Sequence, residues 1–219
     1  MRTSMVRRTL MSVFWRFTLA QEQDSEKSQI ILEAAARLMQ RKSFKDLSME
    51  ELAQEAGVAK GTLYLYFRSK GDIYLSLLMK GVGGLAALVD EVKMTIKGSA
   101  REMIETILDT SLRLMKDSPF FGNIPILALP GSTPEEIEEG LRRDFFPKLE
   151  EVKKVLSSIF KHGIKTREFR KLDPKRLAGV FLHLLEYCFV HSLLLSDHPT
   201  DPEAEIPFVK ELFFKGILA

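Results

Sequence analysis

The chain has 219 residues, of which 45% are hydrophobic and 28% are charged, a balance that excludes a disordered or membrane-embedded protein and indicates an ordinary soluble one. Its single cysteine, Cys188, excludes an internal disulfide framework and is typical of a reducing cytoplasm. The net charge of +2 is unevenly distributed, because residues 1–80 hold 13 Lys+Arg against 9 Asp+Glu whereas residues 81–219 hold 19 against 21. The positive excess near the N-terminus would favour contact with an anionic partner.

Residues 1–25 form an N-terminal extension whose role the sequence leaves open. Three arginines precede the apolar run TLMSVFW, which Arg16 interrupts at the short limit of an export signal and without a cleavage site after it. The segment is either a basic arm that touches DNA or packs elsewhere, or the product of a start codon placed too early, with Met5 and Met11 as later starts. A segment without function is the simplest interpretation.

A helical repeat of apolar residues begins at Glu26 and ends near Phe44, which predicts a supporting helix. We expect Phe44 to close a small core that this helix shares with later segments. The apolar positions of the repeat are Ile30, Ile31, Ala34, Ala35, Leu38 and Met39.

Residues 48–67 read SMEELAQEAGVAKGTLYLYF and contain two helix signals joined by a turn signal. Ser48 and Glu51 form a capping box that starts the first helix, and Gly57 ends it because glycine adopts the left-handed conformation of a sharp turn. In the second, shorter helix Leu63 and Phe67 face inward at helical spacing. Basic, hydroxyl and aromatic side chains are left to point outward, which predicts a helix-turn-helix, a unit that lays its second helix in the DNA major groove.

A long helix is expected to follow, with Ser69 as its cap, Asp72 in its first turn and its end near Lys97. Three glycines at positions 81–84 weaken it. Either they permit close packing of another helix, or they form a compliant point through which movement in the second half reaches the first.

The remainder of the chain consists of further helices with clear start signals. Ser99 and Glu102 form a capping box for a helix to Lys116, and a long helix is expected after Thr133. Two more begin at Asp173 and Asp201. No segment alternates apolar and polar residues for long enough to predict a strand. The predicted fold class is therefore all-α.

Residues 177–195 are apolar almost all round, yet too short and too polar for a membrane span because His183, Glu186 and His191 interrupt them. A helix that is apolar on every side is buried on every side in a soluble protein. One side would face its own domain and the other a second subunit. We therefore predict a homodimer through residues 173–196 and 203–217.

Enzyme chemistry has weak support in the sequence. His183 and Glu186 have the spacing to share a metal ion, but histidine and cysteine in a helix interface are more often buried without one. No catalytic triad, phosphate-binding glycine loop or paired carboxylate site is apparent. We expect no catalytic residues, no metal and no cofactor.

The run LSMEELAQEAGVAKGTLYLYFRSKGDIYLSLL strongly resembles the tetracycline-repressor (TetR) family of bacterial one-component regulators, over about residues 28–80. The resemblance implies a cytoplasmic homodimer with a three-helix DNA-binding domain, here residues 26–72, and a larger helical domain, residues 73–219, that binds a small effector and dimerises. GIKTREFRKLDP also fits the family layout of the second half.

Matching by position carries the family's DNA contacts onto this chain. Ser48 would cap the helix against the DNA backbone, and Lys70 would touch phosphate. The recognition helix would carry Lys60, Gly61, Thr62, Tyr64 and Tyr66. Two residues depart from the family pattern. Ala59 replaces a common Ser or Thr, which removes one possible phosphate contact. Leu65 replaces a frequent His or other polar residue, so the DNA contact of Leu65 is either to a thymine methyl or absent.

An effector pocket can be placed only by position. On the helix from Ser99 to Lys116, a charged stripe of Glu102, Glu105, Asp109, Arg113 and Lys116 is expected to face solvent. The opposite face and nearby aromatic residues would then line the pocket, namely Met103, Ile107, Ser111, Leu112, Met115, Phe120, Phe121, Phe145, Phe146, Leu149 and Tyr187. A lining rich in Met and Phe is typical of a site for an apolar or aromatic ligand.

The sequence thus predicts a ligand-responsive transcriptional regulator, a repressor released from palindromic operator DNA by a small apolar or aromatic effector. The alternative is a helical ligand-binding or enzymatic protein with a vestigial DNA-binding domain, and a weaker alternative is membrane association through residues 9–19. Specific, salt-dependent binding to the protein's own promoter DNA would exclude the vestigial domain. Fractionation would test membrane association. Which ligand, which operator, and repression or activation stay open.

Overall fold

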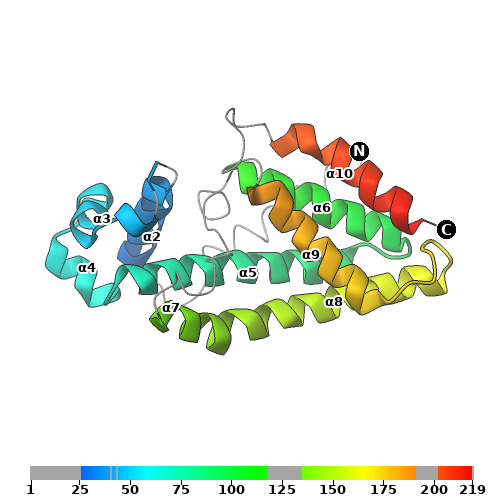
Figure 1. The fold of residues 1–219 in the computed structure, drawn as a ribbon, viewed down its shortest axis with the longest axis horizontal. Coiled ribbons are helices and arrows are strands. Elements are labelled where there is room, and N and C mark those ends of the chain that lie inside the picture. Colours follow the sequence, from blue (N-terminus) through cyan, green and yellow to red (C-terminus); the bar gives the residue numbers. More distant parts are fainter. Residues whose placement is uncertain (1–25, 40, 43, 118–134, 191–201, 219) are drawn as a thin grey trace.

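A computed structural model describes residues 26–39, 41–42, 44–117, 135–190 and 202–218. Over these residues the predicted all-α class is confirmed, since the extended pairing among them is limited to an isolated bridge between Phe169 and Leu218 (Figure 1). The expectations for residues 1–25, Phe120 and Phe121 lie outside the described residues.

The first unit forms a compact group at one end of the molecule (Figure 1). Its elements are α2 (Glu26–Met39), the 3-10 turn η1 (Phe44–Asp46), α3 (Met49–Ala56) and α4 (Lys60–Tyr66). The predicted core is confirmed, with Leu52 and Leu63 almost fully buried. The prediction that Ile30 belongs to the apolar face of this helix is wrong. Ile30 is exposed, because the buried side of α2 is centred on Ile31, Ala35 and Leu38.

Helix α5 (Lys70–Thr95) connects this unit with the rest of the chain and packs against α2, α6, α7 and α8. The predicted cap is confirmed, since Ser69 Oγ accepts a hydrogen bond from the Asp72 amide at 3.2 Å. A Cβ added to Gly81 would meet no atom within 4 Å, so close packing does not explain that glycine. Among the described residues α5 is long and apolar enough to cross a membrane, but 56% of its apolar stretch is buried against other helices, as is usual for a core helix.

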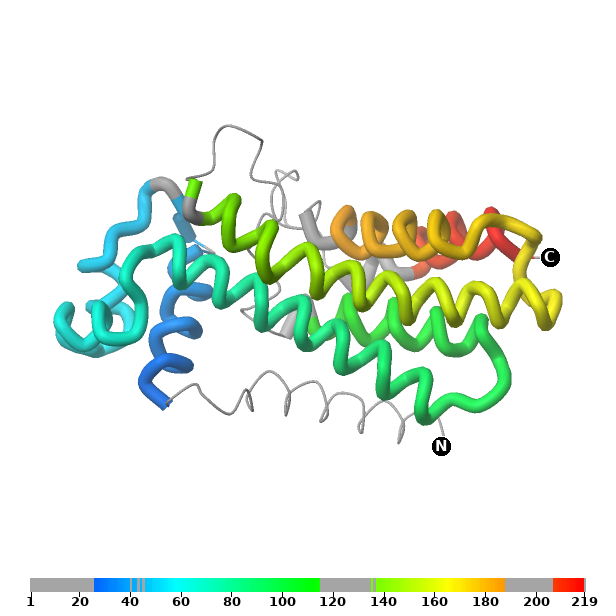
Figure 2. Tube along the Cα trace, turned by 90° about the horizontal axis from the view of Figure 1, so that it is seen from below, coloured from blue at the N-terminus to red at the C-terminus, as the bar shows by residue number. Residues whose placement is uncertain are grey.

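The helices of the second domain lie on both sides of α5, with α7 and α8 on one side and α6, α9 and α10 on the other (Figure 1). Its elements are α6 (Ala100–Asp117), α7 (Glu135–Gly140), the π-helical turn η2 (Leu141–Phe145), α8 (Phe146–Lys165), α9 (Pro174–Val190) and α10 (Pro202–Ile217). Helices α5 and α8 run side by side, whereas α6, α9 and α10 form a second group (Figure 2). The long helix expected after Thr133 is therefore present over the described residues but contains a π turn.

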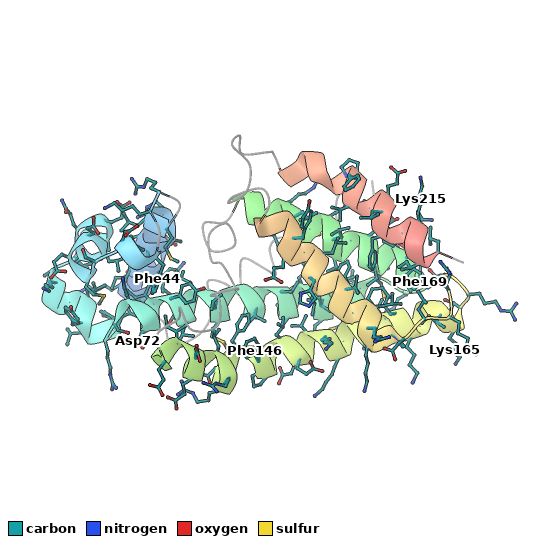
Figure 3. The ribbon with its side chains drawn as sticks, viewed as in Figure 1. Phe44, Asp72, Phe146, Lys165, Phe169 and Lys215 are labelled. Atoms are coloured by element: carbon teal, nitrogen blue, oxygen red, sulfur yellow. The ribbon has the colours of Figure 1, made fainter. Side chains whose placement is uncertain are left out.

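A group of buried aromatic rings joins α8, α9 and α10. The ring of Phe160 lies 5.8 Å from that of Phe169 and 6.1 Å from those of Phe181 and Phe213. Gly163 leaves room for this group, because a Cβ there would lie 2.3 Å from the Phe169 ring (Figure 3). The core of the second domain thus depends on segments that are far apart in the sequence.

Two expectations for α6 need correction. Asp109, predicted to face solvent, is only 7% exposed, since α10 covers it and brings Lys210 Nζ to 2.7 Å from its carboxylate. The start of α6 is only half of a capping box: Ser99 Oγ accepts from the Glu102 amide, but the second capping carboxylate is that of Glu168, which accepts from the amides of Ala100 and Arg101.

Candidate nucleic-acid interface

The turn between α3 and α4 has the geometry expected from the sequence. Ser48 Oγ accepts from the Glu51 amide at 3.2 Å, and Glu51 Oε2 accepts from the Ser48 amide at 3.1 Å, which completes the capping box. Gly57 has φ +66°, a left-handed conformation that glycine adopts without strain. These local signals hold α3 and α4 at a sharp angle, as in a helix-turn-helix.

Helix α4 presents its aromatic side chains to solvent. Tyr64 and Tyr66 are 43% and 39% exposed, so a core role for either is excluded, and Leu65 is 83% exposed. Leu63 and Phe67 are buried, as predicted, and fix the orientation of the helix. Gly61 lies in the open, and a Cβ there would meet nothing within 4 Å. Packing therefore does not require a bare backbone at Gly61, and the close approach of DNA to this position stays a prediction.

Lys60, at the start of α4, is paired within the protein. Its ammonium forms an ion pair with Glu50 of α3 and lies 6.0 Å from the centre of the Tyr64 ring. The hydrogen bond from Lys60 lowers the pKa of Glu50, and the same bond raises the pKa of Lys60. This pairing was not predicted, because it joins residues on two different helices.

Lys70 is also engaged inside the protein. Its Nζ donates to the backbone carbonyls of Phe44 at 3.1 Å and Leu47 at 3.0 Å, and it lies 5.0 Å from the centre of the Phe44 ring. The Phe44 ring also packs at 5.0 Å against that of Tyr74, whose pKa is raised to about 12 by burial (Figure 3). Lys70 therefore joins the first turn of α5 to the turn before α3. Its contact with phosphate stays a prediction.

The residues proposed for an effector pocket fall into three groups. The side chains buried in the second domain are those of Met103, Ile107, Ser111, Leu112 and Phe145. Leu149 is half-buried, whereas Phe146 and Tyr187 are exposed and do not join that interior, because they lie on the outer sides of α8 and α9. The side chain of Met115, together with Phe120 and Phe121, lies outside the described part of the chain.

Polar groups are also buried in the same domain, and the burial of one of them, Lys80, was not predicted. Lys80 of α5 is buried, and a lone lysine in the apolar run LSLLMKGVGG was the signal for it. Ser111 Oγ and Glu186 Oε1 are buried and have no hydrogen-bond partner in the described structure. Glu186 Oε2 lies 3.2 Å from His183 Nδ1, but the described residues contain no group of three potential ligands that would hold a metal ion.

A capped helix-turn-helix with an exposed recognition helix, joined through one long helix to an all-helical domain, defines the class of one-component DNA-binding regulators. Residues 31–77 match the family model described as "Bacterial regulatory proteins, tetR family". This match confirms the predicted resemblance, since the segment that carries the helix-turn-helix is similar to that of TetR-family transcriptional regulators.

Similarity to characterised proteins extends over most of the chain. The fatty acid metabolism regulator protein of Bacillus subtilis is 26% identical over 90% of this chain and 98% of its own length. The crystal structure of the regulator FadR of B. subtilis, in complex with stearoyl-CoA, superposes with a TM-score of 0.69 at 24% identity, over 86% of this chain and 98% of that one. AibR, solved with isovaleryl coenzyme A and operator DNA, superposes with a TM-score of 0.65 at 21% identity. The superposition covers 86% of this chain and 98% of the AibR chain.

Proposed function

We propose that this protein is a dimeric repressor that binds a near-palindromic operator through the α4 helices of two subunits and leaves it when an effector binds the second domain. The observation that carries the proposal is the outward face of α4, where Tyr64 and Tyr66 are exposed while Leu63 and Phe67 hold the helix in place. Tyrosine hydroxyls donate to phosphate, and a lysine can reach guanine acceptors.

The dimer would form through α9 and α10. Each of these helices buries one side within its own subunit and exposes apolar side chains on the other, which favours burial against a second copy. Exposed on them are Val180, Tyr187, Phe208 and Leu212. Two helices from each subunit would form a four-helix interface and place two recognition helices for the two halves of a palindrome.

The effector we propose is a coenzyme A thioester with an apolar acyl chain. The buried side chains of the second domain are mostly apolar, as an acyl chain requires. Two relatives of the same fold were solved with such thioesters, one with stearoyl-CoA and one with isovaleryl coenzyme A. The effector would release DNA only to the extent that it binds the released arrangement of the domains more tightly than the DNA-bound one.

DNA binding is tested by retardation of a duplex from the protein's own promoter, at several salt concentrations. We expect specific, salt-dependent binding, and a loss of about 1–3 kcal/mol for each operator contact removed by Lys60→Ala or Tyr64→Ala. Lys165→Ala, at the end of α8 remote from α4, removes the same charge and should leave operator affinity unchanged (Figure 3). Unchanged affinity in both α4 variants, with the dimer intact, would favour the vestigial DNA-binding domain.

The effector class is tested by adding acyl-CoA thioesters of increasing chain length to the protein–DNA complex. We expect release that depends on chain length and does not occur with coenzyme A alone. Release by aromatic compounds but by none of the thioesters would refute the acyl-CoA assignment while leaving an apolar effector in place.

A further inference from the structure

Glu50 lies on the surface that would face DNA, although an acidic side chain is unfavourable there. It belongs to the first turn of α3 and forms its ion pair across the turn with Lys60 of α4. Both partners are solvent-exposed, Glu50 at 61% and Lys60 at 54% of their side-chain surface. The acidic group is therefore next to the cation that the proposed function assigns to DNA.

The other two glutamates of α3 have different partners. Glu51 completes the capping box and pairs with Lys42. Glu55 pairs with two arginines of the α2 region, at 3.2 and 3.0 Å. Of the three, Glu50 alone is paired with the recognition helix.

We propose that Glu50 is a specificity-determining residue, which makes Lys60 accept neutral base edges and reject phosphate. The inference rests on the proposed function. An ammonium group has three donors, so Lys60 can keep one hydrogen bond to Glu50 while donating others to guanine O6 and N7, which are uncharged acceptors. A phosphate at the same place would bring a second anion next to the Glu50 carboxylate, and the two would repel each other.

This arrangement mainly weakens non-specific binding. Non-specific affinity comes almost entirely from cations that neutralise phosphates and release counter-ions, and a lysine that already has a counter-ion contributes little to it. Operator binding retains the contact to the base edge. Glu50 would therefore raise the ratio of operator affinity to random-DNA affinity.

The test compares wild-type protein with Glu50→Gln, which keeps the shape of the side chain and removes its charge. Dissociation constants are measured for a promoter duplex and for a random duplex of equal length over a series of salt concentrations. For random DNA we expect affinity to rise on the order of tenfold and the slope of log K against log salt to steepen by about 2 for a dimer, since each freed lysine adds about 0.9. The ratio of operator to random affinity should fall.

Two controls separate this role from a general effect of charge. Glu151→Gln changes the net charge equally at a similarly exposed glutamate, which pairs with Lys148 on α8 at 2.8 Å, and should leave random-DNA binding unchanged. In a Lys60→Ala background, Glu50→Gln should have no effect on random-DNA affinity, because Glu50 acts through Lys60. Circular dichroism and thermal melting of each variant check that the fold is retained.

Unchanged or weaker binding of random DNA by the Glu50→Gln variant would overturn the proposal. An equal rise with Glu151→Gln would do so too, as would a rise that persists without Lys60. If Lys60→Ala and Tyr64→Ala both leave operator binding intact, the proposed function itself fails. If they weaken it while Glu50→Gln changes nothing, only the inference about Glu50 is wrong.

Discussion

The DNA-binding unit and the second domain are held together by contacts of different range along the chain. In the unit formed by α2, α3 and α4, the capping box joins residues three apart, and the ion pair between Glu50 and Lys60 joins residues ten apart. In the second domain Glu168 reaches back 69 residues to Ser99, and Lys210 reaches 101 residues to Asp109. The first unit thus depends on local signals, whereas the second depends on how its helices pack.

The two regions also differ in where they keep polar side chains. On α3 and α4 the side chains of Glu50, Lys60, Tyr64 and Tyr66 are exposed at the surface. In the second domain Lys80, Asp109 and Ser111 are buried. An exposed set is suited to a rigid surface such as DNA, while a buried set is suited to a ligand that the domain encloses.

The largest effect is expected in the packed domain. Phe160→Ala removes the ring that contacts those of Phe169, Phe181 and Phe213, and should lower the free energy of unfolding by about 3–5 kcal/mol. Chemical denaturation measures the loss. Phe146→Ala is the matched control, because Phe146 is exposed although it follows the buried Phe145. It should lower the free energy of unfolding by less than about 1 kcal/mol. Equal losses in both variants would contradict the role of the ring group.

A smaller effect is expected where the long-range cap is removed. Burial raises the pKa of Glu168, but hydrogen bonds from Thr166 Oγ, the amides of Arg101 and Ala100 and Ser99 Oγ outweigh it and lower that pKa to about 2. Glu168→Gln should cost about 1–2 kcal/mol at neutral pH.

The same variant predicts a pH dependence. Between pH 4.5 and about 2, Glu168 is protonated in the unfolded chain but still ionised in the folded one. The contribution of Glu168 to the free energy of unfolding is therefore complete above pH 4.5 and is lost as the pH falls toward 2. Melting curves at several pH values should therefore fall less steeply with acid for Glu168→Gln than for the wild type. Parallel curves would show that Glu168 does not cap α6 in solution.

The smallest effect is expected in the locally organised unit. Ser48→Ala removes one acceptor from the capping box and should cost about 1 kcal/mol. Amide hydrogen exchange should become faster in the first turn of α3 and stay unchanged in α8, α9 and α10. Faster exchange throughout the second domain would show that the two regions are less independent than their contacts indicate.

Local signals in the sequence predicted the helices of the first unit and which side chains of α4 are buried or exposed. The caps at Ser48 and Ser69, the turn at Gly57 and the inward positions of Leu63 and Phe67 follow from rules that act within one helical turn. Because Leu63 and Phe67 occupy the inward positions of α4, Tyr64 and Tyr66 are left to face outward.

Contacts between distant segments were not predictable in this way. Asp109 fitted a solvent-facing stripe on α6, and only the position of α10 reveals that it is covered. Lys70 matched a phosphate contact by position, yet its Nζ is held by the carbonyls of Phe44 and Leu47. Phe146 looked like part of an interior but is exposed, since the π turn before it is not visible in the order of apolar residues.

The anchoring of Lys70 and Tyr74 has a mechanical consequence. Because both fix the first turn of α5 to the segment before α3, the helix-turn-helix and α5 would move as one rigid lever. Its 26 residues make an arm of about 39 Å, at 1.5 Å per residue. A tilt of about 5° at the far end would carry α4 about 3 Å, close to the spacing of about 3.4 Å between successive base pairs. A small tilt of α5 within the second domain would thus shift α4 by about one base-pair step along the operator.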